Sequence, residues 1–123
     1  MAILDRVLVV DDNADMRVSL KQLLGLLGYE VETAADGNAA LAAQRARAFA
    51  IVITDIFMAG KEGLETIAAF KREWPRVRVI AMSGGGERAK RDYLTDALHV
   101  GADAALHKPF TLQSLKQALA TGP

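Results

Sequence analysis

The sequence contains no cysteine, only three prolines and few aromatic residues. Without cysteine the chain forms neither a disulfide framework nor a thiolate metal site, which is compatible with a cytoplasmic location. Its 15 basic and 15 acidic residues cancel. The whole protein therefore has no net electrostatic attraction to nucleic acid or to anionic lipid, and we expect neither kind of partner.

Long apolar runs are also missing. Residues 3–10 are mostly apolar, but this run is short and is interrupted by Asp5 and Arg6. A signal peptide needs a longer apolar segment with a cleavage site, and a membrane-spanning helix needs about 20 apolar residues. We therefore expect no targeting segment, no membrane association and a cytoplasmic protein.

Short apolar runs alternate regularly with amphipathic stretches. The runs are residues 6–10, 30–34, 50–54, 78–82 and 104–106. Three are rich in Val and Ile and almost continuously apolar, which is typical of parallel strands buried on both faces. Helical patterns separate the runs, so their order predicts an α/β fold with an open, doubly wound, five-stranded parallel sheet. Because no linker interrupts this order, we expect a single domain over residues 1–123 and no output domain.

Capping and breaking residues mark the expected ends of the helices. They are Gly28 after the first helix, Asn38 before a second over residues 39–48, Pro75 after a third that ends at Trp74, and Thr111 before the last. A fourth helix is predicted over residues 92–100.

Polar residues follow the predicted strands: Asp11 and Asp12 the first, Asp55 the third, Ser83 the fourth and Lys108 the fifth. In a parallel sheet these strand ends lie at one edge, which is where ligands bind in such folds. Carboxylates gathered there repel one another, and magnesium, which prefers a few carboxylate oxygens and several waters, relieves that repulsion. A neighbouring hydroxyl and an ammonium group suit phosphoryl transfer to an aspartate.

Each of these residues also has an ordinary structural explanation. Asp11 and Asp12 are suited to cap a helix that starts near Ala14, and Asp55 to lie in a loop. Ser83 is suited to a turn beside glycines, and Lys108 to a solvated surface. Their combination at one sheet edge favours a shared site.

Four segments together resemble the receiver domains of two-component response regulators. They are VLVVDD (7–12), VITDIFMAGKEG (52–63), VIAMSG (79–84) and GADAALHKPF (101–110). The resemblance covers essentially the whole chain. It implies a flavodoxin-like receiver fold with strand order 2-1-3-4-5, phosphorylation by a sensor histidine kinase or a phosphotransfer protein, and output to a downstream protein target. It also implies a switch that catalyses its own phosphorylation and dephosphorylation.

The resemblance also implies a role for each site residue. Asp55 is the phosphoacceptor. Magnesium is bound directly by Asp12, largely through water by Asp11, and also by Asp55 and the backbone carbonyl of Phe57. Ser83 is the switch hydroxyl, and Lys108 pairs with the phosphoryl group and precedes a cis proline.

Four positions depart from the family pattern. Ala59 stands where proline is usual, Glu62 precedes Gly63 where aspartate is commoner, Ala105 replaces an aromatic residue, and residues 84–90 (GGGERAK) lengthen a loop. We expect the loop at 84–86 and the following helix to rearrange on phosphorylation in place of an aromatic flip. Phe57, where the family often has a polar side chain, is expected to shield the phosphoryl group and slow its hydrolysis, unless it simply packs against a neighbouring loop.

Rival functions fit the residues less well. A flavin carrier needs a glycine- and hydroxyl-rich phosphate loop where Asp11 and Asp12 stand, and an aspartate-nucleophile phosphatase needs a second aspartate at Phe57. Residues 84–90 lack the ending of a P-loop. Residues 87–92 mix both charges, as a solvated helix face does. His99 and His107 have no metal-ligand spacing.

Two alternatives to an independent phosphoacceptor remain open. The first is that the chain is an excised receiver of a longer regulator, and the second is that it is a binding module that acts as an allosteric partner of a kinase.

Overall fold

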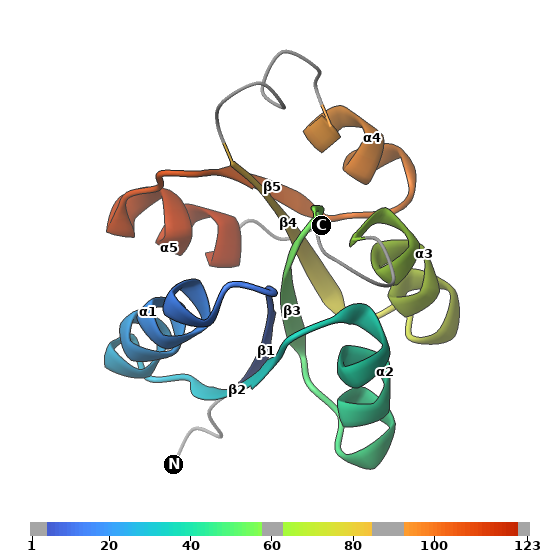
Figure 1. The fold of residues 1–123 in the computed structure, drawn as a ribbon, viewed down its shortest axis with the longest axis horizontal. Helices are drawn as coiled ribbons and strands as arrows, with labels where there is room; N and C mark the ends of the chain where they lie inside the picture. The colour runs from blue at the N-terminus through green and yellow to red at the C-terminus, as the bar shows by residue number, and fades with distance from the viewer. Residues whose placement is uncertain (1–4, 58–62, 85–92, 121–123) are drawn as a thin grey trace.

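A computed structural model of the chain describes residues 5–57, 63–84 and 93–120 and shows five strands that alternate with five helices (Figure 1). The strands are β1 (Arg6–Val10), β2 (Glu30–Ala34), β3 (Ile51–Asp55), β4 (Arg78–Ser83) and β5 (Ala104–His107). The helices are α1 (Ala14–Leu26), α2 (Gly37–Ala46), α3 (Gly63–Glu73), α4 (Tyr93–His99) and α5 (Leu112–Ala120).

The strands form one parallel sheet in the order β2-β1-β3-β4-β5, which confirms the predicted topology. Val10 pairs with Thr54 and Asp55 with Met82, so neighbouring strands end at nearly the same level. β1 and β3 lie next to each other although a strand and two helices separate them in the sequence. Their carboxyl ends are therefore neighbours, which places Asp11 beside Asp55.

Helices cover both faces of the sheet. α1 and α5 lie on one side, and α2, α3 and α4 on the other (Figure 1). Leu20, Leu24 and Leu115 are buried with β-strand residues on the first side, and Ile67 and Phe70 on the second. β3 is buried along its whole length, as its continuous apolar run predicts.

The predicted cap of α2 is wrong. The side chain of Asp36, in extended backbone, accepts a hydrogen bond from the Ala39 backbone N–H at 2.8 Å, and the helix runs over Gly37–Ala46. Asn38, predicted as the cap of a helix over 39–48, lies exposed in the first turn. Both residue types cap helices well. The helix begins after Asp36 because the backbone of Asp36 is extended. It ends before Arg47, where the backbone becomes extended again.

Other helix boundaries follow the sequence closely. Gly28 has a φ of 100°, as expected of a glycine beyond a helix end. Thr111 caps α5, since its Oγ1 accepts a hydrogen bond from the Ser114 N–H at 3.0 Å. α1 is capped by Asn13, whose side chain accepts from the Met16 N–H at 3.0 Å. That excludes Asp11 and Asp12 as the cap of this helix.

Within the residues that the structure describes, no helix is long and apolar enough to cross a membrane.

Candidate functional site

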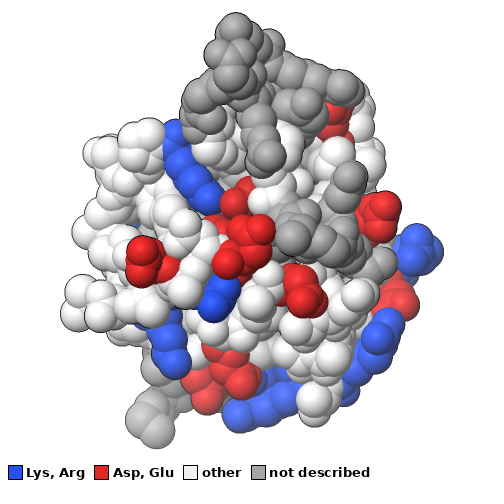
Figure 2. All heavy atoms as spheres, in the orientation of Figure 1, with Lys and Arg blue, Asp and Glu red and all other residues white. Residues whose placement is uncertain are grey.

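Three of the predicted site residues meet at the carboxyl end of the sheet. The Lys108 Nζ lies 2.8 Å from Asp55 Oδ2 and 3.1 Å from Asp11 Oδ2. Lys108 follows β5 and is 97 residues from Asp11 in the sequence, so only the completed sheet brings them together. Acidic side chains also gather near the middle of the face drawn in Figure 2.

Asp11 is completely buried. Its Oδ1 accepts a hydrogen bond from the Asn13 N–H at 2.9 Å, and its own N–H donates to the Ala34 carbonyl at 3.1 Å. Burial raises the pKa of Asp11 above its ordinary value, although the Asn13 N–H and the charge of Lys108 oppose that shift and the charge of Asp55 adds to it. Asp11 is therefore held rigidly, and its charge is only partly compensated.

Asp55 ends β3 and is 7% exposed. Its Oδ1 accepts from the Phe57 N–H at 2.9 Å, while its Oδ2 faces Lys108. The two oxygens thus have different partners and a fixed orientation. Gly63, the first residue of α3, approaches so closely that an added Cβ would overlap with the backbone of Asp55 and Ile56.

Lys108 carries the compensating charge of the cluster. Burial lowers its pKa, but hydrogen bonds and charges from Asp55 and Asp11 outweigh burial, and its pKa is raised overall. Lys108 is therefore charged at neutral pH. Its N–H donates to the Ser83 carbonyl at 2.8 Å, and the Lys108–Pro109 peptide bond is cis, as the family resemblance implies.

A hollow of about 290 Å³ opens over the cluster. It is lined by Asp11, Asp12, Asn13, Asp55, Phe57, Gly84 and Lys108. Asp12 is exposed, and Phe57 is half-buried against the core on the side of α2 and α3. The hollow is therefore lined by carboxylate side chains together with an aromatic residue.

Ser83 is placed differently from the other site residues. It ends β4 and is nearly buried, and its hydroxyl donates to the Gly84 carbonyl at 3.4 Å. It therefore lies at the predicted edge of the sheet without a hydrogen bond to a site carboxylate.

The side chains around the hollow suit a hard cation. The available donors are carboxylate and carbonyl oxygens, without cysteine or histidine. Within the described residues, no three acidic or histidine side chains are arranged as a complete set of metal ligands. Magnesium does not need one, because it commonly keeps several waters and takes only one or two carboxylates. The carboxylates of Asp11, Asp12 and Asp55 therefore fit this ion, and Phe57, whose carbonyl the family resemblance assigns to it, lines the same hollow.

Comparison with known proteins identifies the family. A model described as "Response regulator receiver domain" matches residues 7–120. The chain belongs to this family.

Two named relatives differ in how much of their own length the match covers. The transcriptional regulatory protein PrrA of Mycobacterium tuberculosis is 37% identical over 110 residues, which cover 89% of this chain but 46% of PrrA. The chemotaxis protein CheY of Pseudomonas aeruginosa is 32% identical over 115 residues, which cover 93% of this chain and 92% of CheY. The receiver thus spans less than half the length of PrrA and most of CheY.

The fold also agrees with solved structures. The chemotaxis protein CheY4 of Vibrio cholerae has a TM-score of 0.83 and 31% identity, and the match covers 95% of this chain and 97% of that one.

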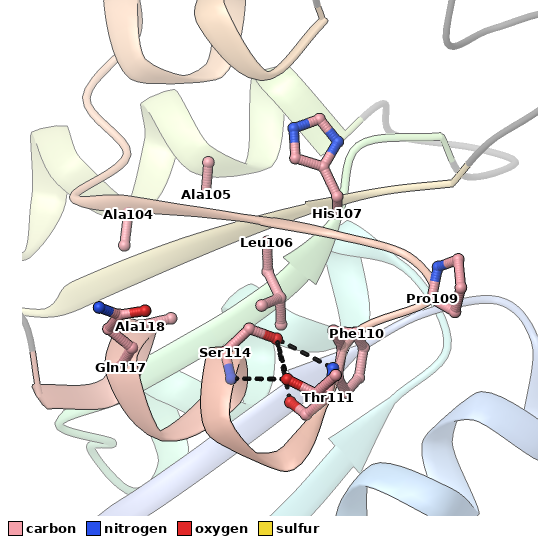
Figure 3. A pocket seen from close by; sticks show the side chains of 10 residues that line it. All are labelled: Ala104, Ala105, Leu106, His107, Pro109, Phe110, Thr111, Ser114, Gln117 and Ala118. Carbon is pink, nitrogen blue, oxygen red and sulfur yellow. Dashed lines mark hydrogen bonds between the residues drawn. The ribbon is translucent and has the colours of Figure 1, made fainter.

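A second hollow of the receiver, of about 490 Å³, lies along the edge strand β5 and beside α5 (Figure 3). Ala104 and Leu106 point toward α5, whereas Ala105 and His107 project from the other side of β5. Ala105, where the family pattern has an aromatic residue, is half-buried against the core on the α3 and α4 side. Both faces of this strand are therefore lined by small side chains near its start.

Two residues that contact the site were missed by the sequence interpretation. Asn13 caps α1 and lines the hollow, and Arg17 donates a hydrogen bond from Nη1 to the Asp11 carbonyl at 2.7 Å. The signal for Asn13 was its place before the apolar pattern of α1. Nothing in the local sequence indicates the contact of Arg17.

Three departures from the family pattern, namely Ala59, Glu62 and the loop from residue 85 onward, lie outside the described residues.

Proposed function

We propose that this receiver accepts a phosphoryl group on Asp55 from a sensor histidine kinase or a phosphotransfer protein, with Mg²⁺ held beside Asp11 and Asp12. The observation that carries this proposal is the ammonium group of Lys108 between Asp11 and Asp55. Asp55 has a fixed orientation, is almost fully buried and lies next to a fixed positive charge. These are the conditions that phosphoryl transfer requires.

The transfer itself needs one nucleophilic oxygen. A carboxylate oxygen of Asp55 forms the new P–O bond while the P–N bond of the donor's phosphohistidine breaks, and the electron pair remains on the imidazole nitrogen. The Phe57 N–H holds the other oxygen in place. When bound, magnesium supplies positive charge that offsets the charge of the phosphoryl oxygens.

Lys108 and Ser83 act on the transferred group. Lys108 is 2.8 Å from Asp55 Oδ2, close enough to pair with an oxygen of a phosphoryl group whose phosphorus is bonded to that carboxylate. Ser83 reaches the same group by exchanging its hydrogen bond to the Gly84 carbonyl for one to a phosphoryl oxygen. That exchange is the switch we propose.

Phosphotransfer tests the assignment directly. The receiver is incubated with Mg²⁺ and either acetyl phosphate or a phosphorylated histidine kinase, and labelling of wild type is compared with Asp55→Ala. We expect labelling of wild type alone. Equal labelling of the two proteins would refute Asp55 as the phosphoacceptor.

Magnesium binding is tested without any phosphodonor. An ion that binds only the folded protein raises the melting temperature, by an amount that grows with its concentration. We expect this rise in wild type and its loss in Asp12→Ala, with Glu65→Ala, an exposed acidic residue of α3, as the matched control.

For output, we propose contacts with a downstream protein in the cytoplasm, and no direct binding to nucleic acid or membrane. The described residues contain no helix suited to a membrane, and the net charge of zero favours neither surface. Because PrrA-like and CheY-like relatives both match, a single-domain receiver over 1–123 and the receiver of a longer regulator are two forms of this proposal. The length of the gene distinguishes them.

A further inference from the structure

Arg17 contacts the site from the second turn of α1. Its side chain is half-buried, and its Nη1 donates to the Asp11 backbone carbonyl at 2.7 Å. A short hydrogen bond from a charged donor is stronger than one between neutral groups. The accepting carbonyl belongs to the peptide unit that joins Asp11 to Asp12, so this contact fixes the plane of that unit.

The other contacts of Asp11 hold different groups. Its N–H is tied to Ala34, its Oδ1 to the N–H of Asn13, and its Oδ2 to Lys108. Among the contacts that the described residues make, the one from Arg17 is to the carbonyl, immediately before Asp12. It therefore lies where the backbone of Asp12, and with it the exposed carboxylate, leaves β1.

The backbone of Arg17 is itself well anchored. The Arg17 N–H donates to the Asn13 carbonyl at 3.1 Å, and the Asn13 side chain caps the same helix. The guanidinium group thus extends from a fixed helix start to a fixed strand end. A planar guanidinium also loses little further freedom when it forms such a bond, in contrast to the flexible amine of lysine.

We propose that Arg17 is a positioning residue that orients the Asp11–Asp12 peptide and thereby sets the affinity of Asp12 for Mg²⁺. This inference rests on the proposed function, because it takes Asp12 to be a magnesium ligand. Residues that orient metal ligands commonly affect affinity by about 10- to 100-fold when replaced.

The sign of the effect separates positioning from simple electrostatics. Removing a positive charge near a cation site would strengthen Mg²⁺ binding, since like charges repel. Losing the orientation of Asp12 would weaken it. Arg17→Met keeps most of the apolar stem and removes both the charge and the hydrogen bond, so the two explanations predict opposite shifts.

The experiment measures the Mg²⁺ dissociation constant by calorimetric titration of the full chain without phosphodonor. We expect a dissociation constant about 10-fold higher for Arg17→Met and a smaller rise for Arg17→Lys, which keeps the charge. Lys21→Met, an exposed position four residues further along α1, is the matched control and should bind as wild type does. At saturating Mg²⁺ the phosphotransfer rate of Arg17→Met should return to that of wild type.

A double variant tests whether Arg17 acts through Asp12. If it does, adding Arg17→Met to Asp12→Asn should cause little further loss of affinity, because coupled positions are not additive. Additive losses, or unchanged or tighter binding by Arg17→Met, would overturn the inference. If Arg17→Met does not fold, unchanged binding by Arg17→Lys overturns it. Absence of Mg²⁺ binding in wild type would instead refute the proposed function itself.

Discussion

Asp11 illustrates how burial and charge compete in the acidic cluster. Its pKa is raised mainly by burial, even though Lys108 and the Asn13 N–H favour the charged form. The folded chain therefore holds this proton more tightly than the unfolded chain does. By linkage, the contribution of Asp11 to stability falls as the pH rises through its raised pKa. A carboxylate that costs stability when ionised is typical of a functional site.

This linkage predicts the pH dependence of Asp11→Asn. Asparagine does not titrate, so the free energy of unfolding of the variant, relative to wild type, should increase as the pH rises above the ordinary value of 3.8 and level off once wild-type Asp11 is ionised. A constant offset from the altered contact with Lys108 does not change that slope. Urea unfolding at several pH values, in the presence of EDTA, measures it; parallel curves for the two proteins would contradict the assigned shift.

Phe57 permits a second prediction at the scale of one residue. Its ring lies half-buried at the hollow and packs against the core, so packing and shielding of the phosphoryl group are compatible. Phe57→Asn should shorten the lifetime of phosphorylated Asp55, because a polar side chain there orients attacking water. Phe57→Leu, which keeps an apolar side chain, should retain a long lifetime. Decay of the phosphorylated protein measures both, and equal lifetimes for wild type and Phe57→Asn would exclude shielding.

At the scale of elements, the start of α2 shows what the sequence could not decide. Asp36 and Asn38 are both good capping residues, and two positions separate them. Only the backbone conformation distinguishes them: Asp36 is extended, with φ −154° and ψ 173°, and its side chain bonds the Ala39 N–H. The strands were easier to predict, because buried parallel strands leave continuous apolar runs.

Substitution of the two candidate caps tests this correction. Asp36→Ala removes the capping hydrogen bond and should lower the free energy of unfolding by about 1 kcal/mol. Asn38→Ala, at an exposed position inside the helix, should change it by less than about 0.5 kcal/mol. Urea denaturation compares the two variants, and a larger loss for Asn38→Ala would restore the original prediction.

At the scale of the whole molecule, the sheet assembles the site. The sequence indicated which residues follow the strands, and parallel pairing implied that they meet at one edge. The sequence did not indicate that Lys108 bridges Asp11 and Asp55, or that the Ser83 hydroxyl bonds Gly84, since both depend on side-chain orientation. The contact of Arg17 with Asp11 joins a helix to a strand end and is equally hidden from local patterns.

The output of the receiver is expected to involve α4 and β5. Ala105 provides no aromatic ring to rotate, so the signal should appear as a change in protection of the helix and strand themselves. We expect amide hydrogen exchange over α4 (Tyr93–His99) and the preceding loop to change when beryllofluoride and Mg²⁺ are added. Asp55→Ala should show no such change. Identical exchange in wild type with and without beryllofluoride would contradict this expectation.

The close approach of Gly63 to the end of β3 constrains how the receiver can vary. Alanine is normally the better residue in a helix, yet at the first position of α3 its methyl group would overlap with the backbone of Asp55 and Ile56. In a library of all substitutions at this position, selected for the native fold, only glycine should therefore be recovered. Any lineage that altered it would have to displace α3 from β3, and with it Asp55, the phosphoacceptor that we propose.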